Sequence, residues 1–222
     1  MSSIDYARFA LVLLRCGEIA RDEGAGSGIT VLYQELLENA SLSFLRAHEE
    51  AILAERAFEV AHPELFALVD GLDAAYAASR STVKDHFPDA GLPEALIGLS
   101  SLFDKLNAAE SLLNILDDSF VDEPWAAKEM NGPFGRRMPG LLKDIGALVL
   151  ADARLLDSIE ERALRYGPAF ERHLQFKRVV RHVYGAASGH YQSIHWRASW
   201  GKEGAGPVSW GPFSFRAPFR TW

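Results

Sequence analysis

The chain has 222 residues, a net charge of −7 and an apolar fraction of 48%. This composition fits a folded chain with a substantial core and excludes general disorder. The longest apolar run, Phe9 to Leu14, is far shorter than the roughly 20 residues that span a bilayer. Cys16 is the only cysteine, which excludes an internal disulfide and a thiolate cluster. Since the N-terminus does not resemble a signal peptide, a cytoplasmic location is expected.

Apolar residues recur at helical spacing along most of the chain, and no alternating strand pattern of useful length occurs. The sequence therefore predicts an all-α, single-domain bundle of about six helices over residues 1–222. Breaks are expected at the glycine-rich run 24–28, in an irregular segment at 118–138 and at Gly167-Pro168. The predicted helices cover residues 4–21, 30–61, 63–86, 93–117, 139–166 and 169–184.

The C-terminal segment differs from the helical body at 1–185. Residues 186–222 contain three prolines, four of the five tryptophans and eight aromatic residues in all, without a helical period. Long segments without secondary structure are usually functional or disordered, and the aromatic content argues against disorder. We expect residues 186–222 to form an irregular strap that covers a site. A strap that only completes the core is the alternative.

The charges are unevenly distributed. Residues 161–222 carry ten Lys/Arg against three Asp/Glu, whereas residues 1–160 carry 13 against 27. The basic end could bind a carboxylate, a phosphate or haem propionates, or it could complement the acidic helices. Because the whole chain is acidic, without a nucleic-acid motif or a spanning segment, neither nucleic acid nor a membrane is expected as a partner.

Four of the seven histidines lie between residues 171 and 197. His173 is expected on a partly apolar helix face, as a metal ligand or as a hydrogen-bonded core residue. His182 follows nine positions later, on the opposite side of that helix, so the two cannot share one metal. Glu59 and His62 have the Glu-x-x-His spacing of dinuclear carboxylate sites. No second such pair occurs, so these side chains could equally form a solvated face.

The small-residue turn from Gly185 to Gly189 follows a predicted helix, whereas a phosphate-binding loop follows a strand. A helix C-cap with glycine in the left-handed conformation is the alternative to a functional loop. The nearby serines lack the context of a nucleophile elbow, so hydrolase chemistry has little support.

His173-Leu-Gln, the hydrophobic and basic stretch to Val183-Tyr184-Gly185 and the turn Ala186–Gly189 resemble a known family. They are similar to the histidine-ligated haem-dependent aromatic oxygenases, which include tryptophan and indoleamine dioxygenases and bacterial tyrosine hydroxylases. The resemblance covers about 20 residues and a loose match around 48–66. It implies haem b held by His173, with His182 as second choice. It also implies a distal catalytic residue, His62, with His48 as second choice.

The resemblance implies an oxygenase that uses dioxygen or peroxide on a small aromatic substrate such as tyrosine or tryptophan. Hydroxylation is favoured over ring cleavage, because Gly-Ala-Ala-Ser-Gly replaces the Gly-Thr-Gly-Gly signature of the dioxygenases. The expected substrate contacts are Arg181, Arg197, Ser188, Gly189 and Trp196, and a homodimer is compatible with this function. Two alternatives stay open: a non-catalytic helical protein that binds a ligand or partner, and a helical dinuclear iron oxidase.

Overall fold

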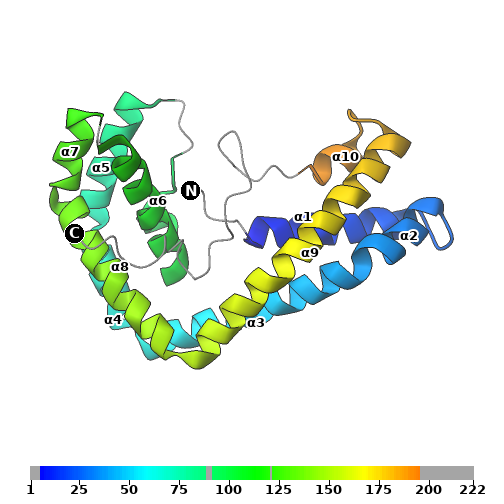
Figure 1. The fold of residues 1–222 in the computed structure, drawn as a ribbon, viewed down its shortest axis with the longest axis horizontal. Helices are drawn as coiled ribbons and strands as arrows, with labels where there is room; N and C mark the ends of the chain where they lie inside the picture. The colour runs from blue at the N-terminus through cyan, green and yellow to red at the C-terminus, as the bar shows by residue number, and fades with distance from the viewer. Residues whose placement is uncertain (1–5, 89–91, 121, 196–222) are drawn as a thin grey trace. The chain divides into compact units, whose positions relative to one another are not determined.

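The protein is described by a computed structural model that covers residues 6–88, 92–120 and 122–195. These residues are mostly helical, and no strand occurs among them, which confirms the all-α prediction (Figure 1). None of the helices in these ranges is long and apolar enough to cross a membrane. In chain order the elements are α1 (Tyr6–Asp22), α2 (Gly28–Tyr33), the π-helical turn η1 (Gln34–Glu38), α3 (Asn39–Ala61), α4 (Glu64–Asp70), α5 (Asp73–His86), the 3-10 turn η2 (Leu96–Gly98), α6 (Leu102–Phe120), α7 (Pro124–Met130), α8 (Pro133–Ala151), α9 (Ala153–Tyr184) and α10 (Gly189–Ser193).

The described residues group into two compact units. The first comprises Ala54–Leu156, which contain the end of α3, the elements from α4 to α8 and the start of α9. The second joins residues 6–53 to residues 157–195 and contains α1, α2, η1, most of α3, most of α9 and α10. The boundaries thus fall inside α3 and inside α9. Each unit is described below by itself.

Aromatic side chains form the centre of the second unit. Phe9 of α1 packs edge-on against Phe44 of α3 and Tyr166 of α9, with ring centroids 5.1 and 5.0 Å apart. All three rings are buried. Because a buried aromatic ring removes about 150–250 Å² from water, such contacts dominate the energetics of a small core. The same core includes Leu13, Cys16, Ile29, Leu37, Phe176, Val180, Tyr191 and Ile194.

A glycine-rich turn joins α1 to α2, as the sequence predicts. Gly24 and Gly26 have φ values of 81° and 87°, which side chains other than glycine rarely adopt. Ser27 then caps α2 by accepting a hydrogen bond from the Thr30 amide at 3.1 Å. The Thr30 hydroxyl donates to the Ala20 carbonyl at 2.6 Å, which ties the new helix to the end of α1.

The helix break predicted at Gly167-Pro168 is wrong, because α9 continues through both residues to Tyr184. A proline inside a helix removes one backbone hydrogen bond. Tyr166 and Ala169, on either side of the pair, are buried in the second unit. Tertiary packing of this face therefore outweighs the local penalty.

The irregular segment predicted at 118–138 is also wrong, because it contains α7 and the start of α8. Pro124 and Pro133 lie in the first turns of these helices, where a missing amide hydrogen costs little. Pro139 lies inside α8 instead of opening it. Gly135 allows close packing of α8 on α7, since a Cβ at this position would lie 2.5 Å from the Met130 Cα. The proline and glycine residues that predict a loop here mark the starts of two helices.

In the first unit, residues of the segment 92–101 before α6 are bound to α5. Tyr76 stacks edge-on against Phe134, with centroids 5.4 Å apart, and its hydroxyl donates to the Glu94 carbonyl at 2.6 Å. Arg80 donates to the Pro93 carbonyl at 2.7 Å. Apart from η2, residues 92–101 are not helical, so the helix predicted from 93 starts only at Leu102.

Candidate functional site

His173 lies on the inward face of α9 and is completely buried in the second unit. Its Nε2 atom is 3.1 Å from the carbonyl oxygen of Ile194, which directly follows α10. A carbonyl only accepts hydrogen bonds, so Nε2 carries the proton and Nδ1 carries the lone pair. This hydrogen bond connects Ile194, near the end of the described residues, to α9.

The surroundings of this imidazole are apolar. The Phe9 ring meets it edge-on with centroids 5.8 Å apart, and Phe170 lies 6.4 Å away. Its Nδ1 has no hydrogen-bond partner within the described part of the chain. Burial lowers the pKa of His173 to about 4, against the opposing effect of the Ile194 hydrogen bond and with smaller contributions from Lys177 and His195. The imidazole is therefore neutral at physiological pH.

With the hydrogen bond to Ile194 in place, the arrangement around His173 leaves no position for a haem iron. Nε2, the ring nitrogen farther from the backbone, is occupied by the Ile194 carbonyl. Nδ1 is bonded to Cγ, so an iron on Nδ1 would bring the macrocycle against the backbone of α9. The edge-on Phe9 ring also packs against the imidazole. His182, the second choice, is exposed on α9. A haem ligand at His173 would therefore require the Ile194 hydrogen bond to open.

The two candidate distal residues belong to different units. His48 lies in α3 of the second unit, buried and stacked on Phe44 with ring centroids 5.7 Å apart. His62 directly follows α3 in the first unit, where it contacts Phe58 and lies 3.4 Å from the Glu64 carboxylate. Each histidine therefore has an ordinary structural environment of its own.

Glu59 has a structural role in place of the metal-binding role that its spacing to His62 suggested. Its Oε1 accepts hydrogen bonds from the Leu102 amide at 2.7 Å and the Ser101 hydroxyl at 3.0 Å, which caps the N-terminus of α6. In the described ranges no group of three or more His, Cys, Asp or Glu could hold a metal ion. The dinuclear iron alternative therefore gains no support.

The turn from Gly185 to Gly189 connects two helices. Gly185 has a φ of 85°, as in the C-cap alternative, and Gly189 is the first residue of α10. The Ser188 hydroxyl accepts a hydrogen bond from the Tyr191 amide at 3.2 Å and donates to the Gly185 carbonyl at 2.9 Å. Ser188 is thus the N-cap of α10, and the substrate contacts predicted for Ser188 and Gly189 stay predictions. Arg197 and Trp196 lie outside the described residues.

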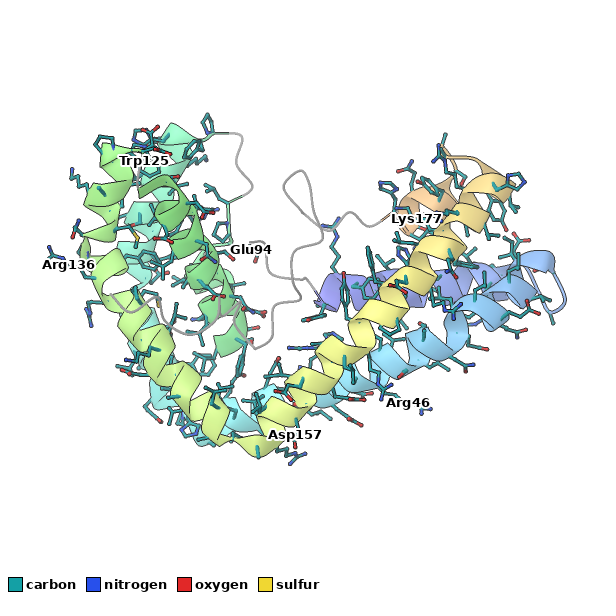
Figure 2. All side chains as sticks on the ribbon, viewed as in Figure 1. Arg46, Glu94, Trp125, Arg136, Asp157 and Lys177 are labelled. Atoms are coloured by element: carbon teal, nitrogen blue, oxygen red, sulfur yellow. The ribbon has the colours of Figure 1, made fainter. Side chains whose placement is uncertain are left out.

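Basic side chains gather along the C-terminal half of α9. We call this set the α9 basic face; Lys177 is labelled in Figure 2, and the other members are exposed. The members are Lys177, Arg178, Arg181 and His182. Lys177 is half-buried, with its ammonium 5.8 Å from the centre of the Tyr191 ring of α10. Lys177 therefore lies beside α10.

Arg178 and Arg181 differ from Arg165 of the same helix in their neighbours. Arg165, one helical turn from Glu161, donates to that carboxylate at 2.7 Å. No acidic residue stands three or four positions from Arg178 or Arg181 in the sequence. Neither guanidinium has an ion-pair partner among the residues that the structure describes. Arg181 is among the substrate contacts expected from the sequence, whereas Arg178 is not. The absence of acidic residues around Arg178 is nevertheless visible in the sequence.

No family model matches the chain, and no match was found among curated proteins or among solved structures. The resemblance to the haem-dependent aromatic oxygenases therefore stays a prediction.

Proposed function

We propose that the protein is a helical binding protein that uses the α9 basic face to hold an anionic partner. The observation that carries this proposal is the exposure of Arg178 and Arg181 without a carboxylate partner in the described ranges. Guanidinium groups bind carboxylate and phosphate oxygens in bidentate geometry, so an anion gains charge-assisted hydrogen bonds here. The sequence left this function open as one alternative, a non-catalytic helical protein that binds a ligand or partner.

The helix dipole explains only part of the face. Basic residues in the last turn of a helix stabilise its negative end, and the effect falls off within that turn. Arg181 and His182 lie in the last turn of α9, and this role accounts for them. Arg178 lies farther from the helix end, where the dipole favours a positive charge little. Binding of an anion accounts for all the members together.

Chromatography on immobilised heparin, a generic polyanion, tests the proposal. We expect Arg178→Ala/Arg181→Ala to elute at clearly lower salt than the wild type, because two charge contacts are lost. Arg136→Ala/Arg137→Ala is the matched control, since it removes two exposed, adjacent charges from α8 (Arg136 is labelled in Figure 2). Identical elution of the two double variants contradicts the proposal.

A haem-dependent aromatic oxygenase is the second candidate. The observation that favours it is the neutral, buried imidazole of His173, since a neutral imidazole is the form that binds a metal. This function requires the hydrogen bond to Ile194 to open, so that Nε2 becomes a ligand. Absorbance of protein purified from haemin-supplemented cells tests it. A stoichiometric Soret band that disappears in His173→Ala supports the oxygenase, and its absence contradicts it.

A further inference from the structure

We infer that the outer face of α3 is the contact surface of a homodimer, in which the α3 helices of two copies pack antiparallel. Its basis is a row of four exposed side chains that is complementary to itself under a two-fold axis. The row, which we call the α3 outer row, comprises Leu42, Arg46, Glu49 and Leu53, and all four residues belong to the second unit. This inference is independent of the α9 basic face.

The α3 outer row lies on one side of the helix. Successive residues of an α-helix are rotated by about 100°, so spacings of four, three and four positions keep the row within about 60° of the circumference. All four residues are exposed; Leu42 is 46% exposed and Leu53 is 54% exposed. Arg46, labelled in Figure 2, extends from α3 away from α1. The opposite side of the helix carries Phe44 and Ala51, which are buried in the core.

The two charged members of the row have no ion-pair partner within the part of the chain that the structure describes. Arg46 precedes Glu49 by three positions and Glu50 by four. An arginine that precedes a glutamate is in the less favourable order for an ion pair within one helix. An acceptor for Arg46 and a donor for Glu49 are therefore better supplied by another molecule.

Antiparallel packing of a second copy supplies both. When the two-fold axis passes between positions 47 and 48, Arg46 lies opposite Glu49 of the second copy, and Leu42 lies opposite Leu53 of the second copy. The symmetry repeats each contact, so the interface contains two ion pairs between two leucine contacts. Parallel packing would instead bring Arg46 near Arg46 and Glu49 near Glu49, and repulsion between like charges disfavours it.

The size of the surface predicts the strength of the dimer. The α3 outer row extends over eleven residues, which corresponds to about 16 Å of helix. A single helix pair of this length buries less than the roughly 1,200 Å² of a standard stable interface. The leucine contacts remove apolar surface from water, and the ion pairs select the register. The dimer is therefore weak, reversible and dependent on concentration.

Sedimentation equilibrium of the full chain over a range of protein concentrations tests the inference. We expect a monomer–dimer equilibrium that Arg46→Glu and Glu49→Arg each weaken about tenfold, because both symmetric ion pairs become repulsive. The double variant Arg46→Glu/Glu49→Arg should restore dimerisation, since it exchanges the charges of both pairs. An equimolar mixture of the two single variants should also associate. Arg136→Glu, which changes the net charge equally at an exposed position of α8, should dimerise like the wild type.

Disulfide formation tests the antiparallel register. Leu42→Cys/Leu53→Cys should form a covalent dimer on oxidation, because the two positions lie too far apart along α3 for a bridge within one chain. Neither single cysteine variant should form one, since each position is as far from its own copy across the axis. Cys16 is buried and therefore does not compete. Circular dichroism verifies that every variant keeps its helicity.

Three outcomes overturn the inference. The first is a monomer at every concentration, and the second is a dimer that neither charge variant weakens, since such a dimer uses another surface. The third is a covalent dimer of a single cysteine variant, which contradicts the antiparallel register. Retention on heparin depends on Arg178 and Arg181, so failure of the dimer and failure of the proposed function are distinguishable.

Discussion

The hydrogen bond between His173 and Ile194 defines the state of one buried imidazole. Neutral histidine needs one donor and one acceptor position, and the Ile194 carbonyl satisfies the donor. Protonation would add a charge in an apolar environment, which costs free energy. Protonation of this one side chain should therefore lower the stability of the second unit.

His173 is expected to make stability depend on acid. Its folded pKa, about 4, lies below the unfolded value of 6.5, so the unfolded chain binds the proton first. His173 therefore leaves the free energy of unfolding unchanged above pH 6.5. As the pH decreases towards 4, it lowers the free energy of unfolding by up to about 3 kcal/mol. Urea unfolding of wild type and His173→Gln at a series of pH values measures it. We expect the variant to lose less stability on acidification.

The matched variant for this measurement is His182→Gln, which removes an exposed histidine from the same helix. It should follow the wild-type pH dependence. If His173→Gln and the wild type lose stability in parallel between pH 6.5 and 4, the buried imidazole does not control the acid response.

At the scale of elements, the contact of α8 with α7 depends on the absence of a side chain at Gly135. A Cβ there would lie 2.5 Å from both the Cα and the carbonyl oxygen of Met130, and backbone atoms cannot move aside cheaply. We expect Gly135→Ala to lower the free energy of unfolding by about 2–3 kcal/mol. Gly140→Ala, on the same helix with open space around it, should instead stabilise by up to about 1 kcal/mol. Equal values in denaturant titrations would contradict this packing.

The cap that Glu59 provides for α6 gives a second prediction at this scale. Glu59→Ala leaves the Leu102 amide without its acceptor, which should cost about 1 kcal/mol. Glu59→Gln keeps a carbonyl oxygen at the same place and should cost less. Thermal unfolding of both variants compares them. An alanine variant as stable as the glutamine variant would mean that water replaces the cap without loss.

The differences between predicted and observed elements have one physical cause. Helical periodicity identified α1 and α3 because it reports local burial on one face. The single helices predicted at 63–86 and 139–166 are each interrupted, at Gly71-Leu72 and at Asp152. Pro168 is a local signal of a break, but Tyr166 beside it packs against Phe9 and Phe44, which are distant in the sequence. For Glu59, the spacing to His62 suggested a metal site, but its actual partners are 42 and 43 residues away. Single-sequence patterns do not contain such contacts.

At the scale of the whole molecule, the end of the second unit can be located by truncation. A chain that ends at Gly185 lacks the buried Tyr191 and Ile194 and leaves His173 without its acceptor. It should lose about 3 kcal/mol or more relative to a chain that ends at His195. Chemical unfolding monitored by circular dichroism compares the two truncated chains. Equal stabilities would show that α10 contributes little to the core.

The expected covering strap at 186–222 is thus divided in two. Its first part forms α10 and packs Tyr191 and Ile194 into the core of the second unit, as in the core-completing alternative. The rest, residues 196–222, lies outside the described residues, so its covering role stays a prediction. Measurements on the chain that ends at His195 would separate the two roles.

The sequence by itself determined the all-α class and the glycine turn at 24–28, and it offered the left-handed cap at Gly185 as an alternative. These features depend on interactions within a few residues, which periodicity and backbone preference report. Only the tertiary structure decided that α9 passes through Pro168, that Ile194 occupies the Nε2 of His173 and that Glu59 caps α6. It also placed Lys177 of α9 over the Tyr191 ring of α10. These features depend on contacts between distant segments, whose packing free energy exceeds the local preferences that the sequence displays.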